Sequence, residues 1–424
     1  MNDYRKMWAD LGMDLDRHDQ LLAAIPVLYG DTYLSQRNRP SGMQYFDFVM
    51  SEIHGLRIQE LVEHRKRGGI VIGTYCVFVP EDLIIAANGV CVGLCAGAQF
   101  SVPDGEAILP RNTCPLIKSS LGFAVNGTCP YLKASNFVVG ETTCDGKKEM
   151  FEIFGDVHPI YVMEVPQKKT AAGRALFLDE LYGLKKRLEQ ESGVEIAADR
   201  LAEATAVVEG KYRAMQRLHA ARAANPAPVS GLDALLVNQI AFFDDPRRFT
   251  EKTEDLAAEL EQRTAANEGV ASADAPRLLM SGSPMALPNW KVHALVERSG
   301  AVVVGEESCV GSRYYGSLSQ GRGKSLEEQM SAIADRHLNV HCACFTPNNE
   351  RLDDIVALAR ATNAQGVIHY NLQFCQTYAN EAVKVERHLA KHGLPLLRLE
   401  TDYGEEDTGQ LQTRIEAFLE TLRV

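Results

Sequence analysis

Short runs of apolar residues recur along this chain and alternate with longer segments in which apolar positions have helical spacing. Four of the runs cover residues 70–73, 137–140, 301–305 and 366–370. Continuous short apolar runs bounded by turn-forming residues are typical of strands that are buried on both faces of a parallel sheet. Residues 81–87, which follow the first run, fit a helix. The alternation predicts an α/β fold.

Longer helical patterns fill the middle of the chain. Between residues 173 and 222, leucine, valine and alanine recur at helical spacing among charged residues, which predicts long amphipathic helices. Residues 264–273 are polar or small, and this composition indicates a linker between domains. A second series of strand and helix patterns begins after Pro276 and ends in a helix near residues 411–422. This second series is typical of a doubly wound domain.

The length of 424 residues exceeds what one hydrophobic core usually serves. We therefore predict three parts. Residues 1–66 form a helical N-terminal segment that covers the fold or contacts a second copy. Residues 67–265 form a first α/β domain with additional long amphipathic helices, and residues 276–424 form a second α/β domain. Doubly wound sheets bind ligands at the carboxyl ends of their strands, so we expect a site in the cleft between the domains.

The charge and the absence of long apolar stretches narrow the classes of partner. The net charge is −12, from 44 basic and 56 acidic residues, which disfavours nucleic acid and anionic membranes. No stretch approaches the roughly 18 continuous apolar residues of a membrane span, and the first residues lack the apolar region of a signal peptide. These features predict a cytoplasmic protein. In that compartment, ten cysteines favour metal binding or thiol chemistry over disulfides.

Most cysteines occupy positions that suit a shared site. Two precede proline, Cys114 and Cys129, and two form the pair Cys342 and Cys344. Four others follow the apolar runs, and scattered structural thiols would not keep such a register with the strands. These four are Cys76, Cys144, Cys309 and Cys375.

Iron–sulfur clusters need soft thiolate ligands and accept them from several loops. A structural zinc site usually contains paired Cys-x-x-Cys or Cys/His ligands, and this sequence has no Cys-x-x-Cys. The pattern therefore favours a cysteine-ligated cluster over zinc. Cys91, within an apolar run, fits a buried core thiol, and Cys95 fits either role. The spacing alone leaves open which of the other cysteines bind.

A few charged residues beside the cysteines are candidates for chemistry. Lys118, Lys147 and Lys148 would neutralise an anionic cluster or bind a charged substrate, although solvated lysines on helices are the commoner case. Glu141 lies at the mouth of a predicted strand and is a candidate for proton delivery, with a simple hydrogen-bonding role equally favoured. Asp145 fits a helix cap better than an acid.

Nucleotide-binding motifs are absent. The segment 321–325 resembles part of a phosphate loop, but Leu318 stands where that loop needs glycine, so we reject ATP binding on this chain. Gly282 lies in a strand–turn–helix context without the dinucleotide glycine spacing, so nicotinamide binding has no support. The histidines show no metal-like spacing, and His369 fits a hydrogen-bonded core histidine.

At these residues the chain resembles the 2-hydroxyacyl-CoA dehydratase and benzoyl-CoA reductase superfamily, and within it the double-cubane cluster proteins. Together the matching segments extend over residues 70–424. They are residues 73–81, 110–120 with Gly122 and Phe123, 139–148, 305–309, 342–344, 372–375 and 400–403.

The resemblance implies two flavodoxin-like domains, a homodimer and oxygen-sensitive, anaerobic iron–sulfur chemistry. Ordinary dehydratases hold one [4Fe-4S] cluster with three cysteines, and the corresponding positions here are Cys76, Cys144 and Cys375. The double-cubane type carries two [4Fe-4S] units joined by a sulfide, [8Fe-9S], and needs three more thiolates. The additional cysteines that fit are Cys114, Cys129 and Cys344, with Cys342 and Cys309 as substitutes for the last.

The resemblance also implies a two-component system in which a separate homodimeric, ATP-hydrolysing iron–sulfur reductase supplies low-potential electrons. The leading hypothesis is an oxidoreductase that reduces a small molecule at the double cubane, with Glu141 and Lys118 as catalytic candidates. The alternative is a 2-hydroxyacyl-CoA dehydratase subunit, a lyase that uses one [4Fe-4S] cluster and a ketyl radical. A third hypothesis is an accessory protein that stores or delivers electrons. The sequence does not name the physiological substrate.

Overall fold

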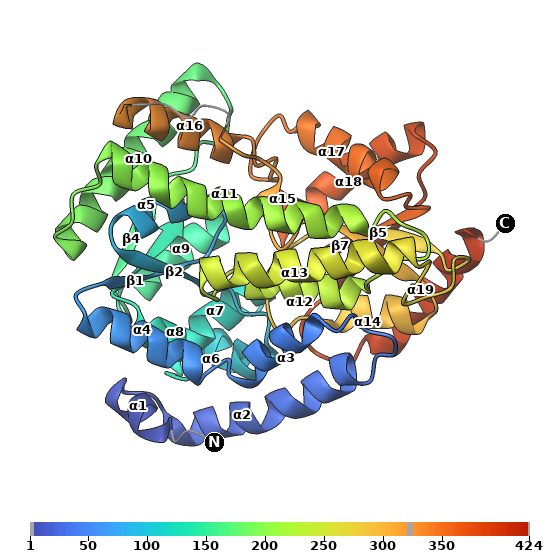
Figure 1. Ribbon diagram of the computed structural model, residues 1–424, viewed down its shortest axis with the longest axis horizontal. Coiled ribbons are helices and arrows are strands. Elements are labelled where there is room, and N and C mark those ends of the chain that lie inside the picture. The colour runs from blue at the N-terminus through green and yellow to red at the C-terminus, as the bar shows by residue number, and fades with distance from the viewer. Residues whose placement is uncertain (1–3, 320–324, 423–424) are drawn as a thin grey trace.

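The computed structural model describes residues 4–319 and 325–422, and within them the strands form two four-stranded sheets (Figure 1). The strand orders are β2-β1-β3-β4 and β6-β5-β7-β8, and all neighbouring strands are parallel. Each sheet therefore begins the flavodoxin-like order 2-1-3-4, which confirms the predicted α/β fold with two doubly wound units. The strands are β1 (Ile70–Thr74), β2 (Gly89–Gly93), β3 (Phe137–Glu141), β4 (Ile160–Met163), β5 (Arg277–Gly282), β6 (Val302–Glu307), β7 (Gly366–Leu372) and β8 (Leu396–Thr401).

We refer to residues 67–265 as the first half and to residues 276–424 as the second half. These boundaries stay a prediction, but one sheet lies in each range. The glycine-rich segment 321–324 considered above lies outside the described residues. No helix in the described part of the chain is long and apolar enough to cross a membrane.

The apolar runs form strands because helices cover both sheet faces. Every residue of β1, β3, β5, β6 and β7 is buried, as expected of strands enclosed in a parallel sheet. β6 stands at the edge of its sheet, yet α12 and α17 pack against it and keep it buried. The other edge strands, β2, β4 and β8, are partly exposed.

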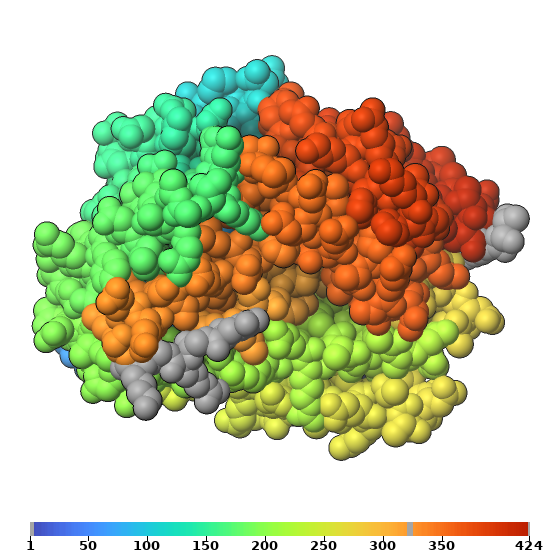
Figure 2. Space-filling view, turned by 90° about the horizontal axis from the view of Figure 1, so that it is seen from above, coloured from blue at the N-terminus to red at the C-terminus, as the bar shows by residue number. Residues whose placement is uncertain are grey.

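The long helices connect the two halves. Residues 173–222 form α10 and α11 as predicted, and α11 packs against α5 and α13 as well as against α15 and α16 of the second half. α10 also packs on α16, and the space-filling view shows the green segment of α10 directly against the orange segment of α16 (Figure 2). The first-half helices are α5 (Glu81–Ala86), α6 (Val102–Glu106), α7 (Pro115–Val125), α8 (Pro130–Ala134), α9 (Asp145–Phe154), α10 (Ala171–Ser192), α11 (Ala198–Ala221), α12 (Gly231–Ile240) and α13 (Pro246–Ala265).

The second half alternates strands and helices in the predicted order. The helix predicted near residues 411–422 is present as α19. The second-half helices are α14 (Lys291–Arg298), α15 (Ser312–Tyr315), α16 (Leu326–Leu338), α17 (Asn349–Ala361), α18 (Gln376–Lys391) and α19 (Thr408–Leu422).

The N-terminal segment is helical, as predicted, and runs along the outside of both halves (Figure 1). Tyr29 and Tyr33 at its centre pack edge-on against Trp290 of the second half, with ring centroids 5.9 and 4.9 Å away. Aromatic pairs in this geometry add to the apolar area that they bury. The segment therefore holds the two halves together on one side. Its helices are α1 (Arg5–Asp10), α2 (Leu15–Tyr29), α3 (Met43–Ser51) and α4 (Leu56–Lys66).

Candidate functional site

One cavity of about 680 Å³ collects the carboxyl-end loops of both sheets and one side of α2. Cys91 lies outside it, in β2, as expected for the predicted core thiol. All six cysteines that the resemblance implies as ligands line the cavity. Its cysteines are Cys76, Cys95, Cys114, Cys129, Cys144, Cys309, Cys342, Cys344 and Cys375.

The strand order explains why distant cysteines meet. β1 and β3 are adjacent in the first sheet, and they are the strands at which the chain switches direction across the sheet. Cys76 follows β1 and Cys144 follows β3, so both sulfurs come from this switch point. Cys375 follows β7, the corresponding third strand of the second sheet. The fold thus places these cysteines where open α/β sheets bind ligands.

Four cysteines stand at the cap position of a helix: Cys114 before α7, Cys129 before α8, Cys144 before α9 and Cys375 before α18. At each of these thiols, backbone N–H groups of the following turn act to lower the pKa, in opposition to burial. These are N–H groups that a helix cannot satisfy internally, and they stabilise negative charge on sulfur.

The two Cys-Pro motifs also mark helix starts. Pro115 and Pro130 occupy the first helical position, where the missing N–H costs nothing and the fixed φ starts the helix. The sequence predicts Asp145 as a helix cap. Instead Cys144 is the cap and Asp145 is the first residue of α9, with its side chain 98% exposed.

The sulfurs of the cavity differ electrostatically. Burial raises the pKa of Cys129 and of Cys144 to about 11. In the second half, a hydrogen bond with Cys114 lowers the pKa of Cys375 to about 7. Hydrogen bonds from the thiols of Cys309 and Cys344, opposed by burial and aided by the charge of Arg313, hold the pKa of Cys342 well below its usual value.

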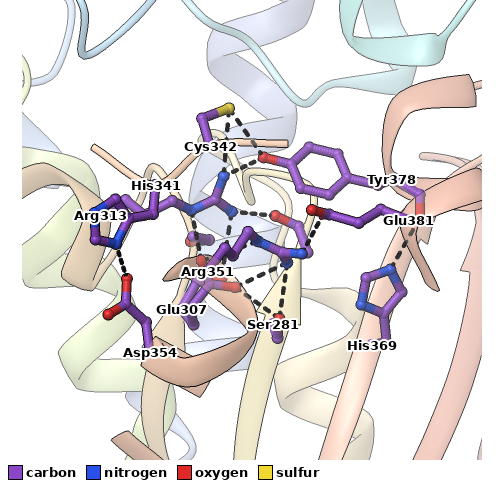
Figure 3. A network of polar contacts seen from close by, with 12 residues as sticks. Ser281, Glu307, Arg313, His341, Cys342, Arg351, Asp354, His369, Tyr378 and Glu381 are labelled. Carbon is purple, nitrogen blue, oxygen red and sulfur yellow. Dashed lines mark hydrogen bonds and ion pairs between the residues drawn. The ribbon is translucent and has the colours of Figure 1, made fainter. Parts of the chain in front are cut away.

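Two residues beside Cys342 were missed by the sequence analysis. Arg313 lies four positions after Cys309, in the short helix α15, and Tyr378 lies three positions after Cys375, in the first turn of α18. That spacing is the signal that could have found them. Both are buried, and both contact the sulfur of Cys342 (Figure 3).

The two catalytic candidates from the sequence do not line the cavity. Glu141 is fully buried and forms an ion pair with Lys147, and it is Lys147 that reaches the cavity wall. Lys118 is buried against Glu106, at 2.6 Å, and also donates to the carbonyl of Arg111 at 3.0 Å. Lys148 is half-exposed and outside the wall.

The rest of the wall is mainly apolar. Among the described residues that line it, Lys147 is the only lysine or arginine, Asp145 the only acid and His54 the only histidine. Burial lowers the pKa of His54 to about 3, so its ring is neutral. The apolar part of the wall includes Leu21, Ile25, Leu28, Met50, Ile53, Leu116, Phe123, Phe242, Phe243, Leu287 and Trp290.

The donor set fits an iron–sulfur group better than a single ion. In the described part of the chain, no three His, Cys, Asp or Glu side chains are close enough together to hold one metal ion. A polynuclear cluster takes its thiolates at separate corners and accepts them from several loops. The cavity offers sulfurs from both halves, and N–H donors to sulfur are a feature by which proteins tune such clusters.

Comparisons with known proteins confirm the superfamily resemblance noted in the sequence. A family model described as "2-hydroxyglutaryl-CoA dehydratase, D-component" matches residues 76–422. The chain is 38% identical to the putative dehydratase subunit YjiM of Escherichia coli, over 85% of this chain and 94% of that protein. It is 26% identical to the beta subunit of (R)-2-hydroxyglutaryl-CoA dehydratase from Acidaminococcus fermentans, over 85% of this chain and 95% of that subunit. It is 20% identical to a subunit of benzoyl-CoA reductase from Thauera aromatica, over 81% of this chain and 87% of that subunit.

Proposed function

The chain belongs to the 2-hydroxyglutaryl-CoA dehydratase D-component family, and we propose that it is an iron–sulfur reductase component that reduces a small molecule at a double-cubane [8Fe-9S] cluster. Relatives in the family are named as subunits of dehydratases and of a reductase, which supports an enzyme with more than one component. In the proposal, a separate homodimeric ATP-hydrolysing iron–sulfur reductase supplies the electrons.

The observation that carries the proposal is the number and placement of the cavity cysteines. A single cubane of the dehydratase type would use Cys76, Cys144 and Cys375. Six further thiols share the same cavity, and Cys114 and Cys129 stand at helix starts as Cys144 and Cys375 do. We propose these two as additional ligands. The sixth comes from the group Cys309, Cys342 and Cys344, of which the sequence favours Cys344.

The composition of the cavity wall supports a small substrate. A coenzyme A thioester carries several phosphate charges, and proteins bind phosphate with arginine, lysine or helix N-termini. Lys147 is the one lysine or arginine among the described wall residues, and Glu141 already neutralises it. The helix N-termini at the wall begin at cysteines, which the proposed cluster would occupy. The wall instead continues past the cysteines into apolar residues of α2. This space beyond the sulfurs also favours substrate chemistry over the hypothesis of a simple electron store.

When bound, the cluster would supply low-potential electrons, and the chain's own residues supply the surroundings. The N–H groups at the helix starts stabilise charge on the sulfurs. Lys147 is the wall residue best placed to hold a proton, because its ammonium is kept by Glu141 and by the carbonyl of Tyr75 at 3.3 Å. Glu141, predicted for proton delivery, thus acts through Lys147 in our proposal, and Lys118 has no role at the cavity.

Exposed apolar residues support the proposed homodimer. Val27, Leu34 and Phe48 on the N-terminal segment are 65%, 60% and 49% exposed. Exposed large apolar side chains on one segment would suit a contact with a second copy of the chain. The sequence analysis predicted this segment as a cover or a dimer contact, and α2 does close one side of the cavity with Leu21, Ile25 and Leu28.

The test is the content of iron and acid-labile sulfide per chain after anaerobic purification, with an electron paramagnetic resonance spectrum of the reduced protein. About eight irons and nine sulfides would support the double cubane. About four irons would favour the 2-hydroxyacyl-CoA dehydratase, the function that the names of most relatives suggest. Absence of iron after anaerobic reconstitution would contradict both functions.

A further inference from the structure

A buried cation and a buried hydroxyl converge on one sulfur of the cavity, that of Cys342 (Figure 3). Arg313 Nη1 lies 3.8 Å from Cys342 Sγ and Tyr378 Oη lies 3.6 Å from it. Arg313 Nη1 also donates to Tyr378 Oη. Because that oxygen accepts from the guanidinium, its own hydrogen is free to point to the sulfur. Cys342 Sγ therefore has these two side-chain donors in addition to the thiols of Cys309 and Cys344.

The guanidinium of Arg313 is fixed in this position. Its Nε lies 2.9 Å from Glu307 Oε1, and its Nη2 donates to the carbonyls of Gly282 and Glu307. The side chain of Arg313 is only 3% exposed. A buried charge with this many partners cannot turn toward water without losing all of them.

Glu307 is held in turn by Arg351. Arg351 Nη2 lies 2.9 Å from Glu307 Oε2 and also donates to Ser281 Oγ at 3.0 Å. Its other terminal nitrogen pairs with Glu381 of α18. The network thus ties the ends of β5 and β6 to the helix that carries Tyr378.

The same network anchors the loop that carries Cys342. Asn348 Nδ2 donates to the carbonyl of Cys342 at 3.0 Å and to Glu381 Oε1 at 2.8 Å. Cys344, two residues later, has no arginine or hydroxyl partner of this kind among the described residues. Its thiol hydrogen-bonds to the sulfur of Cys342. The two cysteines of the pair therefore differ sharply in what surrounds their sulfurs.

We propose that Arg313 and Tyr378 are positioning residues that hold the sulfur of Cys342 as an anionic ligand, so that Cys342 rather than Cys344 is the sixth ligand of the cluster. The two donors also raise the reduction potential of the iron–sulfur centre at this end of the cavity. This inference rests on the proposed function and revises its choice of Cys344.

The physical basis is the charge that a sulfur ligand carries. Reduction adds negative charge to a cluster and its thiolates, and hydrogen bonds to those sulfurs stabilise the reduced state more than the oxidised state. A positive guanidinium in a buried setting acts in the same direction, since its charge is poorly screened there. Removing either donor lowers the potential.

The first experiment compares Cys342→Ser with Cys344→Ser by iron and sulfide content. Cys342→Ser should lose about half of the iron, because the bridged centre loses a ligand at one unit, whereas Cys344→Ser should keep the wild-type content. The assignment of Cys342 as the ligand would be overturned if Cys342→Ser kept the wild-type iron content. It would also be overturned if only Cys344→Ser lost iron.

The second experiment measures midpoint potentials by redox titration followed by electron paramagnetic resonance. Tyr378→Phe removes only the hydroxyl at the sulfur, and its potential should be more negative than that of the wild type. Tyr314→Phe is the matched control, because Tyr314 is also buried and its hydroxyl donates to Glu81 at 3.0 Å instead of to sulfur. Its potential should be unchanged. Arg313→Gln should shift the potential in the same direction and further.

The outcomes separate this inference from the proposed function. About eight irons in the wild type with equal potentials in Tyr378→Phe, Tyr314→Phe and wild type would overturn the role of the two donors and leave the double cubane intact. About four irons in the wild type would overturn the double cubane and with it Cys342 as the sixth ligand, whatever the potential of Tyr378→Phe. If Arg313→Gln does not fold, Tyr378→Phe decides alone.

Discussion

The two halves of the molecule have the same strand order, and in both a helix starts at a cysteine of the cavity, but the second half also brings a buried cation to a sulfur. In the first half, backbone N–H groups at the starts of α7, α8 and α9 act to lower the pKa of the thiols of Cys114, Cys129 and Cys144. In the second half, Cys342 receives a guanidinium and a hydroxyl from buried side chains. The cation that the first half brings to the cavity wall, Lys147, is bound to Glu141.

This difference shows that the fold alone places the cysteines and helix starts at the cavity, whereas a cation at a sulfur depends on particular side chains. The parallel sheets bring every strand end to one edge, so both halves deliver cysteines to the same cavity. A helix start provides N–H donors wherever a cysteine occupies the cap. A cation at the sulfur, however, requires an arginine with buried partners of its own. The second half supplies these through Glu307, Arg351 and Glu381.

The largest expected effect comes from removing the centre of that network. Glu307→Gln leaves Arg313 and Arg351 buried with Glu381 as their only carboxylate among the described residues. Breaking a buried pair costs about 3–5 kcal/mol. Glu141→Gln is the counterpart in the first half, and Lys147 can turn its ammonium into the cavity, so the cost should be about 2 kcal/mol. Urea unfolding under anaerobic conditions measures both free energies.

The comparison of the two unfolding free energies also depends on how much cluster each variant holds, because loss of the cluster would itself destabilise the chain. Both variants should therefore be unfolded as purified and after iron removal. A smaller loss for Glu307→Gln than for Glu141→Gln in the cluster-free proteins would show that the buried network is not the stronger anchor.

The next effect tests the first half through its ligands. Cys129→Ser removes a thiolate that the proposed double cubane needs and that a single dehydratase-type cluster does not. We expect the iron content to fall from about eight to about four per chain. Cys91→Ser is the control, because Cys91 lies in β2 outside the cavity, and its iron content should equal that of the wild type. Undiminished iron in Cys129→Ser would remove Cys129 from the ligand set.

Much of this arrangement could be predicted from the sequence because it depends on local patterns. Continuous apolar runs predicted β1, β3, β6 and β7. The turn-forming residues after these runs indicated the edge of the sheet at which the cysteines lie. His369 was predicted as a core histidine and is 1% exposed, with Nε2 at 3.2 Å from the carbonyl of Tyr378.

The side-chain network could not be predicted because its members are far apart in the chain. Glu307 follows an apolar strand and looks like an ordinary strand-end carboxylate, while Arg351 lies in a charged helix pattern that is typical of solvated faces. Only the packing of α17 and α18 against the second sheet buries both and brings them together. For the same reason Lys118 and Glu141, which stand beside cysteines in the sequence, were chosen over Arg313 and Tyr378.

The last expected effect is confined to part of the pH range and concerns the contact between the halves. Glu297 of the second half accepts the N–H of Gly231 at 2.6 Å and that of Leu232 at 3.4 Å, at the start of α12. It has no arginine partner among the described residues, and burial raises its pKa to about 7. Glu306, nearby, has Arg222 as partner, and its pKa is lowered in spite of burial.

These opposite shifts have opposite consequences for pH. The unfolded chain ionises Glu297 near its ordinary pKa of 4.5, so between about pH 4.5 and 7 the folded protein binds more protons and loses stability as pH rises. Glu297→Gln keeps an acceptor for the N–H groups and removes that loss. At about pH 8 the variant should gain at most about 3 kcal/mol over the wild type, and near pH 4.5 the gain should vanish.

The measurement is the free energy of unfolding against pH for the wild type, Glu297→Gln and the control Glu420→Gln, whose side chain is exposed on α19. The control curve should follow the wild type throughout. A difference between Glu297→Gln and wild type that does not change with pH would mean that Glu297 is ionised in the folded protein over the whole range. The two halves would then meet through a charged cap on α12, and the contrast with the arginine-paired Glu306 would disappear.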